Sequence, residues 1–408
     1  MSIIVQKFGG TSVANAEKLG RAARRAIKTK LDGHQVVMVV SAMGHTTDEL
    51  VLLARQVNPN PPRREMDMLL TTGEQVSIAL MAMAIEAAGH EAISFTGGQV
   101  GMVTDSSHTK ARIRSIEAER IHKELRTGRI VIVAGFQGIT DEGAITTLGR
   151  GGSDTTAVAL AAALRAEQCE IYTDVDGVYT TDPRVVPQAR KMDEITYDEM
   201  LELASLGAGV MHSRSIEFGK KYNVPIHVRS SLTDVEGTMI VAETSGMESI
   251  VVRGVTLKKD LARVVLVGVP NKPGVAAQIF ARIAEHNIVV DDIIQNVFDK
   301  GHEANIGFTM SLGDFREAHT VCQRIAKDMK LKAVETDDKI AKVSIVGIGM
   351  KTHTGVASKM FNALGKAKIN IQNISTSEIV VSCLLDRKDG EKALNILHDV
   401  FELNKAKG

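Results

Sequence analysis

Three glycine-rich stretches of the chain place charged and hydroxyl side chains where a phosphate or a carboxylate could bind. The first is KFGGTS at residues 7–12, directly after an apolar segment. Lys7 could neutralise phosphate charge while the backbone of Gly9 and Gly10 comes close to the anion, because glycine has no side chain to keep it away. Taken alone, the hexapeptide is also compatible with a surface lysine beside a tight turn.

The second and third stretches add other groups. TTLGRGGSD at residues 146–154 contains Arg150, which can hold a carboxylate through two parallel hydrogen bonds. A tight turn and a helix N-cap explain Gly152 and Asp154, but they do not explain Arg150. YTDVDGVYTTDPR at residues 172–184 combines acids, hydroxyls, tyrosine rings and an arginine, which suits a nucleotide, with a solvated loop as the alternative. Neither the P-loop motif nor the dinucleotide-binding motif occurs in this half of the chain.

The elements that carry these stretches alternate along the chain. Short apolar or β-branched runs bounded by turn residues predict buried parallel strands at residues 3–6, 36–40, 130–134 and 170–173. Segments of helical composition lie between them, at residues 16–30, 73–88, 111–126 and 154–166. This alternation predicts an α/β sandwich, in which glycine-rich turns at the carboxyl ends of the strands are the expected anion sites.

A second architecture follows. Between residues 233 and 260 the sequence loses its long apolar helices, and beyond this boundary residues 264–296 resemble residues 343–377. Each copy predicts a strand, a glycine-containing turn, an amphipathic helix and a second strand. Each turn ends at a helix N-terminus whose N–H groups could receive a carboxylate. The apolar stripes expected in the two cores are Val275, Ile279, Phe280 and Ile283, and Val356, Met360, Phe361 and Leu364.

The amino-acid composition limits the kinds of molecule that the protein is expected to bind. The chain has 408 residues with 49 basic and 49 acidic side chains, and only 3% of its residues are aromatic, with no tryptophan. Balanced charge and few stacking platforms argue against nucleic acid or an anionic membrane as the main target. Cys169, Cys322 and Cys383 lack metal-ligand spacing, which favours buried thiols in a reduced cytoplasm. The first residues predict no signal or transit peptide, and apolar runs such as residues 36–40 are too short to cross a bilayer.

Together these stretches resemble the aspartate kinase family of the amino-acid-kinase superfamily. The similarity lies in KFGGTS from Lys7, VVSAM from Val39, TTGE ending at Glu74, FTGGQVGMVTD from Phe95, TTLGRGGSDTTAVALAAAL from Thr146 and YTDVDGVYTTDPR from Tyr172. VPNKPG, IIQN and ISTSEI resemble the paired ACT regulatory domains of the same family. The resemblance implies an α/β fold: a three-layer αβα sandwich at residues 1–245, a linker and start of the regulatory region at 246–262, and two α+β ferredoxin-like ACT domains at 263–340 and 341–408.

The implied reaction transfers the γ-phosphoryl group of ATP to the side-chain carboxylate of L-aspartate. The product would be 4-phospho-L-aspartate, at the first step towards lysine, threonine, methionine and isoleucine. The acceptor carboxylate has a reference pKa of about 3.9 and is already ionised at neutral pH, so no general base is needed. The enzyme would position the reactants and neutralise phosphate charge. Mg2+ would be held mainly by phosphate oxygens and water, with no metal ligand assigned in the chain.

The resemblance also implies roles for individual residues. Lys7 would contact the transferred phosphoryl group, and Asp154 would orient Lys7. Arg150 would hold the α-carboxylate of aspartate and Glu74 its amino group; taken alone, Glu74 is also compatible with an acid at a helix N-terminus. The rest of the aspartate pocket would be Ser41, Thr47, Gly151, Gly152 and Ser153. The ATP-binding residues would be Lys7, Phe8, Gly9, Gly10, Thr173, Asp174, Tyr179, Thr180, Thr181, Asp182 and Arg184. Gly209 stands where many members carry a lysine, so no lysine contact to ATP is implied there.

The ACT pair would bind lysine, threonine or both as feedback inhibitors, with reciprocal coupling to the substrates. The effector residues would be Asn271, Lys272, Pro273, Gly274, Val275, Ala276, Ala277, Gln295 and Asn296, with Thr376, Ser377 and Glu378 from the second copy. Many members carry aspartate in place of Asn271, which leaves the effector preference open. The implied assembly is a cytoplasmic homodimer or larger oligomer formed through the ACT domains. An internal start at Met247 could also give a short regulatory subunit.

Two other interpretations remain. A related kinase could act on glutamate, acetylglutamate or a nucleoside monophosphate, and a non-catalytic amino-acid sensor could use the ACT pair beside a degenerate kinase domain. The ACT pair and the GRGGSDTTAVALAA segment argue against the first. The joint presence of Lys7, Glu74, Arg150 and Asp154 argues against the second.

Overall fold

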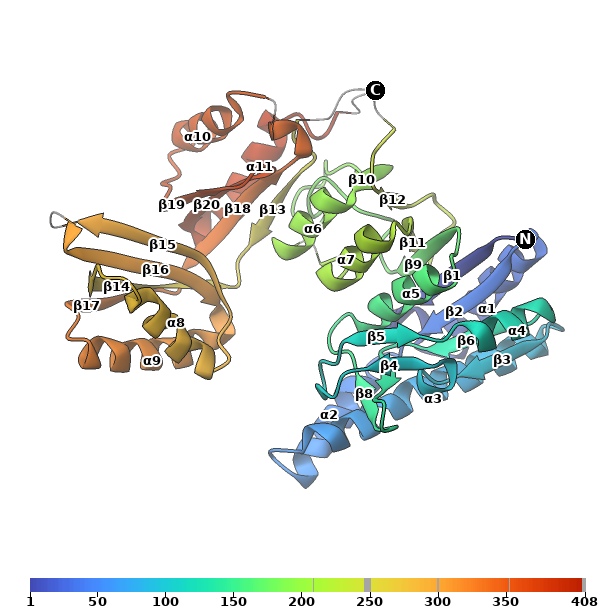
Figure 1. Cartoon of the computed structure of the whole chain (residues 1–408). Helices are drawn as coiled ribbons and strands as arrows, with labels where there is room; N and C mark the ends of the chain where they lie inside the picture. The colour runs from blue at the N-terminus through green and yellow to red at the C-terminus, as the bar shows by residue number, and fades with distance from the viewer. Residues whose placement is uncertain (208, 246–250, 299–300, 352, 406–408) are drawn as a thin grey trace. The chain divides into compact units, whose positions relative to one another are not determined.

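The chain folds into two compact units. The computed structural model describes residues 1–207, 209–245, 251–298, 301–351 and 353–405. One unit comprises residues 1–179 and 191–248, and the other comprises residues 180–190 and 249–408. Figure 1 colours the first unit mainly from blue to green and the second from yellow to red.

An eight-stranded sheet in the order β10-β12-β11-β9-β1-β2-β6-β3 forms the centre of the first unit. Its central strands, β9 (Gln168–Thr173), β1 (Ile3–Phe8), β2 (Gln35–Val40) and β6 (Ile130–Ala134), are all parallel. The outer strands are β3 (Ala92–Phe95), β11 (Ile226–Ser230), β12 (Thr238–Val241) and β10 (Glu194–Thr196). The four strands predicted from the sequence are confirmed, and their runs of Val and Ile are buried as expected for a sheet covered on both sides.

Helices cover both faces of this sheet, which confirms the predicted three-layer αβα sandwich (Figure 1). α1 (Ala16–Leu31) and α3 (Arg63–Ala87) pack on one face, where Met38 and Ile132 join Met81 in one core. α5 (Gly152–Ala163) packs on the opposite face against β1, β2 and β9. The remaining α-helices are α2 (Thr46–Val57), α4 (Glu119–Arg126), α6 (Tyr197–Ser205) and α7 (Ser213–Tyr222).

The helix predicted at residues 111–126 is wrong in its first half. Residues 113–116 form β5 (Ile113–Ile116), which pairs with β4 (Met102–Thr104) in a sheet ordered β5-β4-β7-β8, with β7 (Gln137–Ile139) and β8 (Ile145–Thr147). Two isoleucines flank two exposed polar residues in β5, and pairing with β4 outweighs the helical composition. The predicted helix at residues 73–88 is confirmed but begins earlier, at Arg63.

Among the helices that the structure describes, α3 is the one long and apolar enough to cross a membrane by length and composition. Its buried residues include two carboxylic acids, Asp67 and Glu74, and its apolar residues Ile78, Met81 and Ile85 belong to the core of the sandwich. These contacts are those of a core helix.

The second unit contains both copies of the internal repeat. The first copy consists of β14 (Leu261–Pro270), α8 (Val275–Glu285), β15 (Val290–Phe298), β16 (Glu303–Ser311), α9 (Phe315–Asp328) and β17 (Ala333–Asp337). The second contains β18 (Ile340–Val346), α10 (Val356–Lys366), β19 (Asn373–Thr376), β20 (Val380–Asp386) and α11 (Gly390–Val400). Gly274 and Gly355 precede α8 and α10 with φ of +87° and +88°, so the predicted repeat is confirmed down to its turns.

Both predicted apolar stripes lie in these cores. Ile279 and Ile283 are buried in the first copy, with Val275 and Phe280 packed against its core. Met360 and Leu364 are buried in the second copy, with Val356 and Phe361 packed against them.

The fourth strand of the second sheet comes from a segment that precedes the first copy. β13 (Gly254–Lys258) pairs antiparallel with β18, in the position that β17 holds beside β14. The two sheets have the orders β13-β18-β20-β19 and β15-β16-β14-β17. Residues 254–258 fall in the stretch predicted as linker, yet Val255 is fully buried in the core of the second copy. The first copy is therefore inserted between two paired strands of the second.

Residues 180–190 also pack in the second unit, although they fall within the catalytic domain predicted at residues 1–245. Val186 lies in the core of the second copy. The carbonyl oxygen of Thr180 accepts a hydrogen bond from Val255 N at 2.8 Å, and Thr180 Oγ1 lies 3.0 Å from His398 Nε2. Burial lowers the pKa of this histidine, which favours its neutral form.

Replacing Val255 with alanine should destabilise the second unit. The change removes two buried methyl groups and leaves a cavity, which costs about 2 kcal/mol. Val289→Ala is the matched control, because Val289 is 77% exposed. Hydrogen exchange in peptides from β18 and β20 should accelerate in the Val255 variant only. Equal exchange in both variants would contradict the assignment of β13 to this core.

Candidate active site

The carboxyl ends of the central strands bring several loops to one edge of the sheet. In the strand register, Phe8 lies opposite Val40 and Tyr172, and Val40 lies opposite Ala134. The chain therefore leaves the sheet at the same level after each of these strands. The predicted site residues Phe8, Gly9, Gly10, Ser41, Thr173 and Asp174 lie at this edge.

The loop after β1 is held tightly by its neighbour after β2. Gly44 N donates to Gly10 O at 3.0 Å, and Ser41 N donates to Phe8 O at 3.1 Å. A Cβ atom added to Gly10 would lie 2.8 Å from Ala42 O, which is closer than real Cβ atoms come. Glycine is thus required at this position by the close approach of the two loops.

Lys7 and Asp154 form an ion pair at this edge. The distance from Lys7 Nζ to Asp154 Oδ1 is 2.6 Å, and each side chain is 12% exposed. Asp154 lies in the first turn of α5, where the helix dipole stabilises a negative charge. The ammonium group of Lys7 also lies 3.4 Å from the Cβ position of Gly9, so it folds back over the glycine backbone. The structure thus brings together the two residues that the resemblance assigns to catalysis.

The glycine-rich loop before α5 presents Arg150 to solvent. Gly149 and Gly151 on either side of it have φ of +78° and +67°, the left-handed region that favours glycine. Arg150 is exposed and forms no ion pair with any residue that the structure describes. Ser153 lies against the loop after β6, since a Cβ added to Gly135 would approach its Oγ to 2.7 Å.

Glu74 reaches the same edge from the middle of α3. Its Oε1 accepts a hydrogen bond from Ala42 N at 3.1 Å, while its buried Oε2 has no partner among the described residues. Burial raises the pKa of Glu74 to about 7, although the hydrogen bond from Ala42 opposes this shift. A buried carboxylate oxygen without a donor is unfavourable, so this position suits a cationic or N–H donor from a ligand. Ser41 and Thr47 are half-buried near the ends of the same loop.

The predicted nucleotide residues are divided between the two units. Thr173, Asp174 and Tyr179 belong to the first, whereas Thr180, Thr181, Asp182 and Arg184 belong to the second. The Thr173 hydroxyl donates to Asp174 Oδ1 at 3.1 Å. Arg184 donates to Asp182 through Nε and Nη2, at 2.8 to 3.2 Å, and this contact holds the pKa of the Asp182 carboxyl below its usual value.

The predicted effector residues gather in part. Gln295 Nε2 donates to Asn271 Oδ1 at 3.2 Å, and Asn271 Nδ2 donates to Gly301 O at 2.8 Å. The two copies also contact each other nearby: Lys342 Nζ of β18 lies 2.9 Å from Asp291 and 2.8 Å from Asp292 of β15. The residues predicted from the second copy, Thr376, Ser377 and Glu378, are exposed.

Comparisons with known proteins agree with this arrangement. The model of the amino acid kinase family matches residues 2–230, and two ACT domain models match residues 263–327 and 343–401. The aspartokinase of Bacillus sp. (strain MGA3) is 52% identical over 404 residues, which cover 99% of this chain and 98% of that protein. The chain belongs to the aspartokinase family. Aspartokinase 2 of Bacillus subtilis (strain 168) is 51% identical over 99% of both chains.

Solved structures of the aspartokinase family share the fold. E. coli aspartokinase III in complex with aspartate and ADP has a TM-score of 0.81 at 27% identity, and the alignment covers 98% of this chain and 99% of that one. The expected amino acid kinase fold, followed by two ACT repeats, is thus confirmed.

Mg2+ that arrives with a nucleotide is held mainly by phosphate oxygens and water. Within the described part of the chain, no three His, Cys, Asp or Glu side chains converge as metal ligands. Mg2+ commonly keeps several waters and binds substrate phosphates with few protein ligands. Gly209 has open space around its Cβ position, so packing does not demand glycine there.

Several groups that hold the glycine-rich loop before α5 in place were not predicted from the sequence. Arg214 donates to Leu148 O and Ala111 O at 2.8 Å each, and His212 lies directly against Gly151. The contact of Ala42 with Glu74 uses a backbone N–H, which every residue except proline has, so the residue type does not indicate it. Asp67 could have been found, because it precedes Glu74 by seven residues and so shares its face of one helix.

Glu74→Gln should raise the free energy of unfolding at pH 8. The folded pKa of about 7 exceeds the unfolded value of 4.5, so the folded state binds this proton more tightly. The glutamate therefore costs stability progressively as pH rises from about 4.5 to 7, by about 3 kcal/mol in total. The variant should be more stable than the parent at pH 8 and nearly equal to it at pH 4.5.

Urea unfolding at several pH values measures this difference. Glu86→Gln is the matched control, since Glu86 is exposed on the same helix. A stability gain of Glu74→Gln that did not change with pH would show that the carboxyl is not protonated by burial.

Proposed function

We propose that the chain transfers the γ-phosphoryl group of ATP to the side-chain carboxylate of L-aspartate, giving ADP and 4-phospho-L-aspartate. The observation that carries this proposal is the Lys7–Asp154 ion pair at the carboxyl edge of the sheet, in a chain of the aspartokinase family. The unpaired oxygen of Glu74 and the exposed guanidinium of Arg150 add sites for the two charged groups of an amino acid. E. coli aspartokinase III, which shares the fold, was solved with aspartate and ADP.

Each end of the substrate has a suitable partner. Arg150 binds the α-carboxylate through paired hydrogen bonds, and Glu74 accepts from the α-ammonium group. Ser41, Thr47, Gly151, Gly152 and Ser153 complete the pocket. The side-chain carboxylate then lies towards Lys7, and its oxygen attacks the γ-phosphorus in line as the bond to the ADP oxygen breaks. No proton has to be removed, because the acceptor is already ionised.

Lys7 supplies the electrostatic stabilisation. Its ammonium carries three N–H donors and forms an ion pair with Asp154, so N–H donors remain for the transferred oxygens. Gly9 and Gly10 let the backbone approach the phosphates. The nucleotide is bound by Thr173, Asp174, Tyr179, Thr180, Thr181, Asp182 and Arg184. Mg2+ bound to ATP would neutralise further phosphate charge.

Regulation is assigned to the ACT repeats. Residues 1–245 catalyse, and residues 263–340 and 341–408 bind lysine, threonine or both. E. coli aspartokinase III was also solved with lysine and aspartate, at a TM-score of 0.78, 27% identity, and coverage of 97% of this chain and 99% of that one. We further propose a cytoplasmic homodimer or larger oligomer formed through the ACT domains. Met247, the proposed start of a short regulatory subunit, lies outside the described residues.

Lys7→Ala should reduce turnover by about 10³-fold, because it removes the charge that faces the transferred group. Purified protein is incubated with MgATP and aspartate, and the acyl phosphate is trapped by hydroxylamine as a hydroxamate. Lys28→Ala, an exposed lysine of α1, should retain full activity. Normal turnover of the Lys7 variant would refute its role.

The same assay with a panel of acids separates the competing functions. Aspartate alone should give a hydroxamate. Product from glutamate alone would identify a kinase for another acid. No product from any acid would leave an amino-acid sensor as the function.

Gln295→Ala should raise the concentration of effector needed for half-inhibition by about tenfold, because the side chain belongs to the proposed effector site. Activity is titrated with lysine and threonine, singly and combined. Gln278→Ala, exposed on α8, is the control. Since coupling is reciprocal, aspartate should weaken effector binding by the factor by which the effector weakens aspartate binding. Unchanged inhibition in the Gln295 variant would move the effector site elsewhere.

A further inference from the structure

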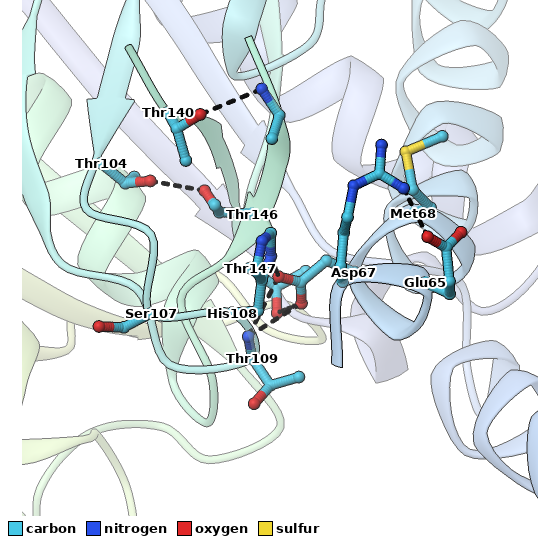
Figure 2. A network of polar contacts seen from close by, with 12 residues as sticks. Glu65, Asp67, Met68, Thr104, Ser107, His108, Thr109, Thr140, Thr146 and Thr147 are labelled. Atoms are coloured by element: carbon cyan, nitrogen blue, oxygen red, sulfur yellow. Dashed lines mark hydrogen bonds and ion pairs between the residues drawn. The ribbon is translucent and has the colours of Figure 1, made fainter. Parts of the chain in front are cut away.

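A buried carboxylate, Asp67 of α3, collects three hydrogen-bonding groups that neither the resemblance nor the proposed function uses. Its side chain has no exposed surface. Thr147 Oγ1 donates to Asp67 Oδ1 at 2.6 Å, and Thr109 N lies 3.1 Å from both carboxylate oxygens. His108 Nδ1 lies 2.7 Å from Oδ2. Figure 2 shows these groups converging from two separate segments upon the helix.

The network fixes a strained turn. Thr109 is β-branched and has φ of +70°, a conformation that such residues rarely adopt because of steric repulsion. Conformations of this kind persist where surrounding contacts determine them, and they cluster at functional sites. Here the carboxylate receives the N–H of Thr109 and a hydrogen bond from the neighbouring ring of His108.

This turn supports the loop that carries Arg150. A Cβ added to Gly149 would lie 3.0 Å from Thr109 O, so the loop rests directly on the turn. Ala111 N donates to Thr147 O at 2.9 Å, and Arg214 joins Leu148 O to Ala111 O. The backbone is thus held on both sides as far as Gly149, one residue before Arg150.

The same helix carries Glu74. Asp67 and Glu74 are seven residues apart, which is two helical turns and about 10 Å along one face. Both are buried, and Gln137 Nε2 donates to Thr71 O between them. One rigid element therefore bears the proposed acceptor of the ammonium group and the anchor of the loop that binds the carboxylate.

We propose that Asp67 is a positioning residue that sets Arg150 and Glu74 at the separation required by the α-carboxylate and α-ammonium groups of the substrate. The inference rests on the proposed aspartate pocket. His108 completes the network by placing a ring N–H beside the buried charge. Loss of the network lowers the affinity for aspartate. The affinity for the nucleotide stays unchanged, because ATP is bound by other loops.

Two adjacent threonines of β8 provide a matched test. Thr146 and Thr147 are both buried, and each makes a hydroxyl hydrogen bond, but Thr146 bonds to Thr104 at 2.6 Å instead of Asp67 (Figure 2). Thr147→Val should raise the KM for aspartate by about tenfold, the effect of losing a hydrogen bond to a charged group, with the KM for ATP unchanged. Thr146→Val should leave both KM values within about twofold.

Variants of His108 supply a rescue test. His108→Asn keeps an N–H donor near the position of Nδ1 and should preserve the KM for aspartate. His108→Leu removes the donor and should raise that KM in the same way as Thr147→Val. Calorimetric binding of aspartate in the presence of a non-hydrolysable ATP analogue measures the same difference without turnover.

The outcomes separate the inference from the function on which it rests. Equal KM values in the two threonine variants, or a loss of thermal stability with both KM values unchanged, would make Asp67 a purely structural residue. Arg150→Ala and Glu74→Gln test the pocket itself. If these two variants bound aspartate normally, the pocket assignment would be wrong; if they failed and Thr147→Val bound normally, only the positioning role would be lost.

Discussion

The ion pair between Lys7 and Asp154 is the contact on which the proposed active site, at the carboxyl edge of the sheet, depends. It joins the first strand of the sheet to the first turn of a helix that begins far along the chain, and both side chains are largely withdrawn from water. Removal of either partner would leave the other as an uncompensated charge, which is far more costly than the pair itself is stabilising. The pair therefore constrains where α5, and the glycine-rich loop before it, can lie relative to β1.

The sequence allowed prediction of groups whose signal is local. Lys7, Arg150 and Asp154 lie in or beside glycine-rich turns, so their surroundings could be inferred from the residue types next to them in the sequence. The contacts of Asp67 with His108 and Thr147 could not be inferred in this way, because these residues are brought together only by tertiary packing. The partner of Glu74 is the backbone N–H of Ala42, and no side chain in the sequence indicates this hydrogen bond.

The same distinction explains the errors in the fold. Strands β1, β2, β6 and β9 were predictable because burial on both faces selects continuous apolar runs. β5 and β13 owe their conformation to partner strands distant in sequence. Likewise, the sequence of residues 180–190 does not indicate that Val186 belongs to the core of the second copy. Because Tyr179 and Thr180 are consecutive, the boundary between the two units falls within the segment that is proposed to bind the nucleotide.

The insertion of the first ACT copy within the second has a consequence for the order of folding. The contacts of the first copy all lie within one continuous segment, residues 261–337, so it can form soon after its own residues are available. The sheet of the second copy must close a long loop before β13 meets β18, and this closure is entropically unfavourable while the intervening chain is unfolded. Once the inserted copy has folded, the chain between β13 and β18 is compact and the loop to be closed is effectively short. The inserted domain thus acts as an internal aid to the folding of the domain that surrounds it.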